Sequence, residues 1–248
     1  METNPKNLFS QHSKEYAAFR PTYPKELYDF ILRHVKNFDV AWDCATGNGQ
    51  AAKELALRFK QVQATDISAK QIENATKRNN IFYSVGQAEK ALFADNSFDL
   101  ITVAQAIHWI NFDLFYPEVV RVAKPNAVLA VWGYSLLSID PIIDEVLTDF
   151  YVHVLGPYWD KERRFIDEKY QTIPFPFAEI KSPSFEMNFE WTLAELAGYI
   201  NTWSAVQKFI QLNQSNPVDE LINSIQPHWE SERKLVTFPL FMRLGKIS

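Results

Sequence analysis

A glycine-rich segment and an acidic residue that follows it are the best candidates in this sequence for binding a cofactor. The segment Gly47–Ala52 matches the pattern G-x-G-x-x-G/A, and Asp66 lies 19 residues beyond Gly47. Glycine lets a backbone approach a ligand closely, and an acidic residue ending a strand can accept hydrogen bonds from both hydroxyls of a ribose. The same pattern is typical of dinucleotide-binding proteins, so an NAD-dependent oxidoreductase is one interpretation.

Asp43 separates two classes of cofactor. It lies four residues before Gly47, at the entrance to the same loop. A dinucleotide places a negatively charged pyrophosphate at the start of the following helix, where a carboxylate would repel it. S-adenosylmethionine (SAM) instead carries a sulfonium and an ammonium group, which an acidic loop attracts. Asp43 therefore favours SAM, and a carboxylate that only caps the following turn is the alternative interpretation.

Several short motifs follow one another along the chain: Phe9, Tyr16–Pro24, Asp43–Gly49, Gly86–Glu89, Gln105–Trp109, Arg121–Pro125 and Thr202–Gln207. Each motif is weak alone, but in this order they are specific. Over nearly its whole length the chain resembles the class I SAM-dependent methyltransferases. Within that class it is similar to the branch of trans-aconitate methyltransferases and related small-molecule methyltransferases.

The resemblance implies roles for the matching cofactor residues. The loop Asp43–Gly49, with Ala45, Gly47 and Gly49, would wrap the methionine part of SAM, and Asp66, followed by Ile67, would hold the ribose. The adenine edge would be met by Gln87 and the backbone of Ala88, and the methionine amino group by backbone carbonyls of Gln105 and Ala106.

Three positions depart from the family pattern. Ala45 replaces the first loop glycine, which is tolerated where the residue does not need a positive φ. Gln87 replaces an acid at the adenine edge, and its carbonyl can still accept a hydrogen bond from the exocyclic amine. Asn126 and Ala127 replace two glycines after the turn at Lys124-Pro125, and asparagine tolerates the left-handed conformation.

His108 is the candidate catalytic side chain. Methyl transfer from a sulfonium is an in-line displacement at an activated carbon, so alignment and desolvation supply much of the catalysis. A carboxylate acceptor needs no base, whereas a hydroxyl or amine gains from one, and His108 lies just beyond the fourth predicted strand. A pocket wall formed by His108 and Trp109 is the alternative. The predicted contacts with a small-molecule acceptor are Trp109, Tyr134, Trp203 and Ser204.

The aromatic N-terminal segment 1–24 is predicted to fold over the cofactor. Tyr16 is a predicted cofactor contact within it. Arg20 would pair with the methionine carboxylate or with an anionic substrate, because guanidinium matches carboxylate bidentately. A plain surface salt bridge is the alternative for Arg20.

Alternating strand and helix patterns predict an α/β fold. Apolar runs that end at Asp43, Ile67, Val85, Ala104 and Trp132 predict five strands, and the segments between them have helical spacing. This alternation predicts a parallel sheet covered on both faces, with ligands at the carboxyl ends of its strands. The late strands Phe185–Phe189 and Leu235–Leu244 complete a Rossmann-like, seven-stranded, mostly parallel sheet with an antiparallel last strand.

Beyond Tyr134 the pattern changes. Helices are predicted at Ile142–Leu155 and Glu190–Gln207, and residues 156–182 are rich in proline and charge. We expect one domain of residues 1–248, with a helical substrate lid formed by 138–182 and 190–230 inserted after the fifth strand.

Composition narrows the functional classes. The formal charge of −5, with scattered lysines and arginines, gives no basic stripe suited to nucleic acid. Cys44 is the single cysteine and the histidines lack metal-ligand spacing, so neither a disulfide nor a metal site is predicted. No apolar run approaches the roughly 18 residues that span a bilayer, so we expect a cytoplasmic protein without a membrane partner, as a monomer or weak homodimer. A non-catalytic SAM-binding protein on the same fold is a further alternative.

Overall fold

The computed structural model describes residues 21–247, which divide into two compact units. The sheet unit contains Thr22–Ser135, Arg164–Phe185 and the chain from Leu240 onward. The helical unit contains Leu136–Arg163 and Glu186–Pro239. Residues 164–182, which the sequence analysis placed in the lid, therefore belong to the sheet unit.

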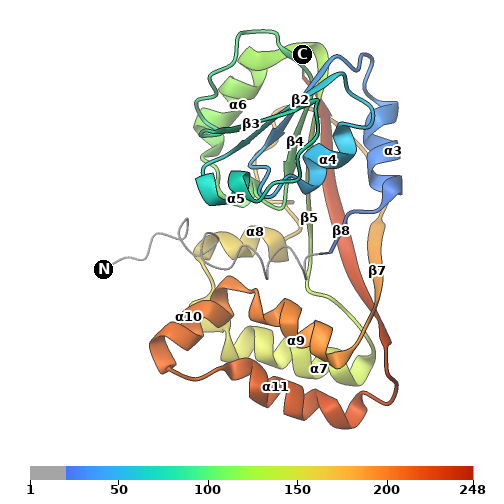
Figure 1. Cartoon of the computed structure of the whole chain (residues 1–248), viewed down its shortest axis with the longest axis vertical. Helices are drawn as coiled ribbons and strands as arrows, with labels where there is room; N and C mark the ends of the chain where they lie inside the picture. The colour runs from blue at the N-terminus through green and yellow to red at the C-terminus, as the bar shows by residue number, and fades with distance from the viewer. Residues whose placement is uncertain (1–20, 248) are drawn as a thin grey trace. The chain divides into compact units, whose positions relative to one another are not determined.

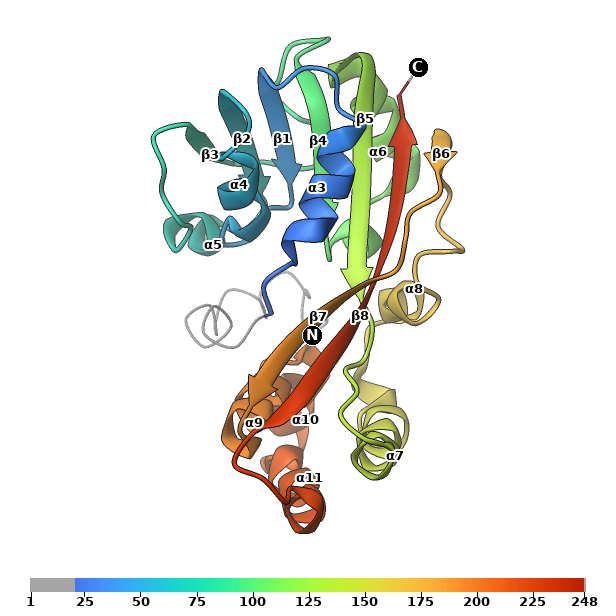
Figure 2. The ribbon, with the colours of Figure 1, turned by 90° about the vertical axis from the view of Figure 1, so that its right-hand side faces the viewer.

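An eight-stranded sheet organises the fold (Figure 1), in the order β3-β2-β1-β4-β5-β8-β6 with β7 paired to β8, which can be followed in Figure 2. Parallel pairing joins its first five strands, β1 (Val40–Cys44), β2 (Gln61–Asp66), β3 (Ile81–Val85), β4 (Phe98–Ala104) and β5 (Ala123–Tyr134). Antiparallel pairing joins β8 (Lys234–Lys246) to β5 and to β6 (Ala178–Ile180), and β7 spans Phe185–Trp191. The predicted fold class is confirmed. The predicted count of seven strands is short by β6, whose three residues are too few to show an alternating pattern.

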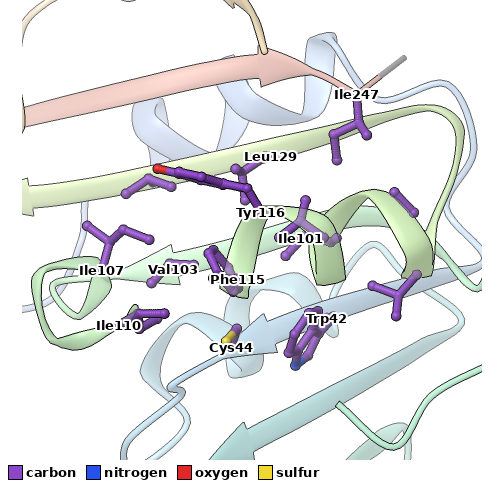
Figure 3. Close-up of a cluster of buried hydrophobic side chains, with 14 of the residues drawn as sticks. Trp42, Cys44, Ile101, Val103, Ile107, Ile110, Phe115, Tyr116, Leu129 and Ile247 are labelled. Atoms are coloured by element: carbon purple, nitrogen blue, oxygen red, sulfur yellow. The ribbon is translucent and has the colours of Figure 1, made fainter. Parts of the chain in front are cut away.

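Helices cover both faces of the parallel strands, with α3 (Lys25–Arg33) and α4 (Gln50–Leu55) on one face and α6 (Phe112–Val122) on the other (Figure 2). Six of the seven residues of β4 are buried, as expected for a strand covered on both sides. Trp42, Val103 and Phe115 belong to the apolar core that joins β1 and β4 to α6 (Figure 3). The core fixes the strand ends that carry the predicted cofactor residues.

Two short helices follow strand ends in the sheet unit. Ser68 caps α5 (Ala69–Glu73) by accepting a hydrogen bond from the backbone of Gln71, which confirms the predicted cap. A 3-10 turn, η2 (Ile107–Trp109), follows β4, and α8 spans Arg164–Asp167.

The helical unit begins with α7 (Pro141–Asp149), which continues into the π-helical turn η3 (Phe150–Val154). Its remaining helical elements are η4 (Gly156–Tyr158), η5 (Lys161–Arg163), α9 (Leu193–Asn201), α10 (Ser204–Asn213), α11 (Pro217–Ile225) and η6 (Gln226–His228). The prediction of one helix over Glu190–Gln207 is wrong, because β7 runs to Trp191 and two helices follow. Thr192 and Glu195 form a capping box that starts α9, and Trp203 is the N-cap residue of α10.

Between residues 21 and 247, none of the helices is long and apolar enough to cross a membrane. Within the same range, no three His, Cys, Asp or Glu side chains are grouped so that they could hold a metal ion.

Candidate functional site at the carboxyl ends of the strands

Residues with left-handed backbone conformations follow the ends of both β1 and β4. The strand order reverses between these neighbours, and such a switch point is where open α/β sheets bind ligands. Ala45 has φ 54° just after β1, and Gln105 has φ 53° just after β4. A non-glycine residue in this conformation costs about 1–2 kcal/mol and persists where its surroundings fix it. Ala45 therefore has the positive φ that would favour the glycine of the family pattern, and the alanine adopts it all the same.

The two loop glycines meet different surroundings. Gly47 has φ 58°, and a Cβ placed on it would find no atom of residues 21–247 within 4 Å. Gly49 has φ 82°, and its Cβ would lie 2.1 Å from Oη of Tyr83, which donates a hydrogen bond to the carbonyl of Thr76 at 2.7 Å. The space beside Gly49 is therefore taken by the Tyr83 side chain, and its positive φ also favours glycine, whereas Gly47 leaves open space beside its backbone.

Asp43 faces the protein interior. It is 1% exposed, and its carboxylate accepts hydrogen bonds from the hydroxyls of Thr46 and Thr102 and from the backbone N–H of Ala52 at 3.0 Å. Burial raises the pKa of Asp43 to about 6, against these three hydrogen bonds, which lower it. The bond to Ala52 caps the first turn of α4, so the capping that the sequence analysis kept as an alternative is present in the structure.

Asp66 lies at the end of β2 beside the open glycine. Its Oδ2 accepts the backbone N–H of Gly47 and its Oδ1 that of Ser68, both at 2.8 Å. Burial raises the pKa of Asp66, partly offset by its backbone hydrogen bonds. Each carboxylate oxygen has a second lone pair, so the group can still accept hydrogen bonds from a ligand.

The side-chain amide of Gln105 makes hydrogen bonds to the backbone of the neighbouring strand. Oε1 accepts the backbone N–H of Tyr134 at 2.8 Å, and Nε2 lies 3.5 Å from the carbonyl of the same residue. The amide therefore ties the ends of β4 and β5 together.

The predicted adenine edge follows β3. Gln87 forms an isolated bridge with Lys90, and Ala88 packs against the core. Gly86 donates its backbone N–H to the carbonyl of Asp66 at 3.0 Å, which holds this turn against the end of β2. Ile67 is exposed beside it.

His108 lies in η2, just beyond β4. It is 7% exposed, and its Nδ1 is 2.9 Å from Oη of Tyr170. The ring of Trp109 lies 5.0 Å from the imidazole, centroid to centroid. Tyr134, at the end of β5, is buried. The sheet unit thus combines an imidazole and aromatic rings with the glycine-containing loop after β1 on the same edge of the sheet.

Comparison with known proteins agrees with this arrangement. The family model described as a methyltransferase domain matches residues 42–131. A putative methyltransferase of Dictyostelium discoideum is 35% identical, over 96% of this chain and 94% of the relative. A probable SAM-dependent methyltransferase of Saccharomyces cerevisiae is 23% identical, over 89% of this chain and 88% of the relative. The solved structure of a putative type II methyltransferase from Anaeromyxobacter dehalogenans is 35% identical with a TM-score of 0.86, and the match covers 92% of this chain and 98% of that one.

The chain belongs to the class I SAM-dependent methyltransferases. This assignment overturns the alternative of an NAD-dependent oxidoreductase.

The residues of this methyltransferase fit its cofactor. Gly47 leaves space beside a left-handed backbone, and the Asp66 carboxylate adjoins that space with lone pairs to accept hydroxyl donors. SAM brings two ribose hydroxyls and a cationic methionine part, which match an acidic, glycine-lined edge.

The remaining predicted cofactor and acceptor contacts belong to other parts of the chain. Trp203 is a buried residue of the helical unit, where its ring packs 5.8 Å from Trp159 and 6.0 Å from Tyr151, and Ser204 is the first residue of α10. Tyr16 and Arg20, and with them most of the predicted covering segment 1–24, lie outside the described residues.

Sequence reasoning missed Tyr170 in this methyltransferase. It lies in the stretch 156–182 that was read as part of the lid, 62 residues from its partner His108. No local spacing links the two residues, so only the fold brings them together.

Proposed function

We propose that this methyltransferase transfers the methyl group of SAM to an oxygen of a small-molecule acceptor, either a carboxylate or a hydroxyl. The observation that carries the proposal is the position of His108, directly after the strand end that bears Gln105, with its imidazole buried among aromatic rings. A polar ring in such surroundings suits a small, desolvated acceptor. A carboxylate acceptor would agree with the resemblance to the trans-aconitate branch.

The cofactor contacts are part of the proposal. Asp66 would accept hydrogen bonds from the ribose hydroxyls, and the backbone of Ala45 and Gly47 would line the methionine part. The carbonyl of Gln105 would accept from the methionine amino group, and Gln87 with Ala88 would meet the adenine. Asp43 supports this arrangement from inside, because its hydrogen bonds to Thr46 and Ala52 fix the loop.

The chemistry needs alignment more than side-chain reactivity. Bound SAM supplies a methyl group that its sulfonium already activates. The chain holds the backbone of the loop after β1 and of Gln105 in conformations that cost free energy, so the cofactor meets a preformed edge. The acceptor side would be formed by His108, Trp109 and Tyr134. Trp203 and Ser204 of the helical unit are proposed as acceptor contacts on the sequence pattern alone.

The class of acceptor, the cellular location and the oligomeric state are proposed from the composition of the chain. The formal charge of −5 favours a small molecule over nucleic acid as the acceptor. We propose a cytoplasmic enzyme that acts as a monomer or weak homodimer.

Two assays in sequence test the proposal. Thermal melts with SAM, its product S-adenosylhomocysteine (SAH) and NAD come first, because a ligand of the native state raises the melting temperature. We expect shifts with SAM and SAH and none with NAD. Labelled-methyl transfer to a panel of small carboxylates, phenols and amines follows, and we expect product from carboxylates or phenols. Tight SAM binding without transfer to any member would instead favour a non-catalytic SAM-binding protein.

A further inference from the structure

The hydroxyl of Tyr170 and the imidazole of His108 form a buried pair in the sheet unit. The side chain of Tyr170 is fully buried, and its Oη lies 2.9 Å from Nδ1 of His108. The two rings lie 5.9 Å apart with an interplanar angle of 34°. Because a buried polar ring is oriented by its hydrogen bonds, the contact with Tyr170 is one that helps to orient His108.

Tyr170 is itself held firmly. Its backbone and that of Lys169 are left-handed, with φ 58° and 53°, a conformation that persists only where the surroundings impose it. Arg243 on β8 donates from Nη1 to the carbonyl of Tyr170 at 3.3 Å and to that of Ile173 at 2.6 Å. The ring of Phe241 packs edge-on against the tyrosine at 4.9 Å.

Arg243 is anchored in turn by β6. Its Nε and Nη2 donate to the two carboxylate oxygens of Glu179 at 2.8 and 2.7 Å, a bidentate pair with a defined geometry. A chain of contacts therefore runs from Glu179 through Arg243 and the backbone of Tyr170 to the imidazole of His108.

The direction of the Tyr170–His108 hydrogen bond decides what His108 can do. A neutral imidazole has one N–H donor and one lone-pair acceptor, and the bond made by one nitrogen fixes the role of the other. The phenol carries one proton to donate, and an imidazole nitrogen is a stronger base than a phenol oxygen. A bond donated by Tyr170 to Nδ1 leaves the ring hydrogen on Nε2.

We propose that Tyr170 is a positioning residue that holds His108 in the tautomer with hydrogen on Nε2, so that His108 donates a hydrogen bond to the methyl acceptor and does not act as its base. The proposal rests on the proposed function for its acceptor. The acceptor is taken here as the carboxylate alternative of the proposed function. In the transfer, its ionised oxygen forms a bond to the methyl carbon while the carbon–sulfur bond breaks. The electron pair of that bond goes to sulfur, and no proton leaves the acceptor.

The tautomer can be measured without any acceptor. Nitrogen-15 labelling of histidine, followed by long-range proton–nitrogen NMR, distinguishes the protonated nitrogen of each ring, and the His108→Asn variant assigns the His108 signals. For the wild-type enzyme at neutral pH we expect one dominant His108 tautomer with hydrogen on Nε2. Hydrogen on Nδ1, or a mixture of both tautomers, would overturn the proposal without recourse to any Tyr170 variant.

The Tyr170→Phe variant adds the causal test, because it removes the hydroxyl and keeps the ring. We expect the single tautomer to give way to a mixture. Tyr116→Phe is the matched control, since Tyr116 belongs to the same core cluster and its hydroxyl donates instead to the carbonyl of Pro174. The control should leave the His108 signals unchanged. An unchanged tautomer in Tyr170→Phe would contradict the assigned role.

Turnover separates this proposal from the proposed function. With an acceptor found in the panel, we expect Tyr170→Phe to lower kcat about tenfold or more, while KM for SAM stays within about twofold. An altered tautomer with unchanged kcat would show that His108 does not contact the acceptor, although methyl transfer itself would stand. Absence of transfer in the wild-type enzyme would refute the proposed function and leave the tautomer result valid for the pair.

Discussion

The loop after β1 and the turn after β4 lie at the same edge of the sheet, but they are held by different kinds of contact. Asp43 fixes the first through Thr46 and Ala52, which lie 3 and 9 residues away. The second depends on Tyr134 and Tyr170, which lie 29 residues from Gln105 and 62 from His108. The loop after β1 thus combines these local contacts with one from Thr102 on β4, 59 residues from Asp43, whereas the contact of His108 with Tyr170 is a distant one.

The two regions are therefore expected to respond differently to substitution. A loop held by its own neighbours can keep its geometry while distant parts of the chain change. A histidine held by a distant tyrosine changes its surroundings whenever that distant segment moves. We expect substitutions in the loop to alter stability and cofactor affinity, and substitutions near Tyr170 to leave SAM binding intact.

The largest expected effect comes from Gly49→Ala. The new Cβ would collide with Tyr83 and would hold an unfavourable positive φ, so we expect the free energy of unfolding to fall by about 2–4 kcal/mol in denaturant titrations. Gly47→Ala is the control, because its Cβ would meet no atom of the residues that the structure describes. It should cost only about 1 kcal/mol of backbone strain. Equal losses in the two variants would contradict the distinction between the glycines.

Asp43 gives the next largest effect, and it depends on pH. Its folded pKa of about 6 lies above the unfolded value of about 3.9, so the folded state binds the proton more tightly. This contribution to stability is fully present below about pH 4 and is lost as the pH rises through 6. We therefore expect the unfolding free energy of the wild type, relative to Asp43→Asn, to fall by about 2–3 kcal/mol between pH 4 and 7.

Urea titrations of both proteins at pH 4, 5, 6 and 7 measure this change. Asp99→Asn, which alters a buried carboxylate paired with Lys124 outside the loop, is the comparison variant. A difference between wild type and Asp43→Asn that does not vary with pH would show that the loop carboxylate keeps an ordinary pKa.

Asp66→Asn should weaken the binding of SAM about tenfold to a hundredfold, because an uncharged amide replaces a carboxylate acceptor. Isothermal titration with SAH measures the affinity. Asp39, just before β1, has an exposed carboxylate that pairs with Lys60. The Asp39→Asn variant is the control, and it should bind SAH as tightly as the wild type does. Equal affinities in all three proteins would mean that Asp66 does not hold the ribose.

Ala45→Gly is expected to have the smallest effect, a gain in stability of about 0.5–1 kcal/mol from relief of the strained φ. Asn126→Gly is the control, since Asn126 also has a positive φ, 66°, but asparagine tolerates that conformation. Thermal melts should show the larger gain at Ala45. A loss of stability in Ala45→Gly would mean that the methyl group of the alanine makes a contact worth more than the strain.

The sequence predicts much of the cofactor side because its signals are local. Strand ends at Asp66 and Ala104 and the cap at Ser68 follow from apolar periodicity and side-chain chemistry over a few residues. The positive φ of Asn126 was expected from the residue type. Asp43 was interpreted as a charge that attracts the cofactor. In the structure its carboxylate points into the protein, where it accepts a hydrogen bond from Thr102 on the neighbouring strand, a contact that the sequence does not indicate.

The rest depends on contacts that no short pattern encodes. The three residues of β6 form a strand because β8 offers them an edge, and Tyr170 meets His108 because α8 belongs to the sheet unit. The break between α9 and α10 occurs at Thr202 and Trp203, within a stretch whose apolar spacing continues smoothly. In each case tertiary packing decides between local alternatives.

The most direct test of the division between the two sides is one titration of SAH into three proteins: wild type, Asp66→Asn and Tyr170→Phe. We expect Asp66→Asn to bind at least about tenfold more weakly, and Tyr170→Phe to bind within about twofold of the wild type. Loss of SAH affinity in Tyr170→Phe, with Asp66→Asn unaffected, would contradict the assignment of Asp66 to the cofactor and of the His108–Tyr170 pair to the acceptor.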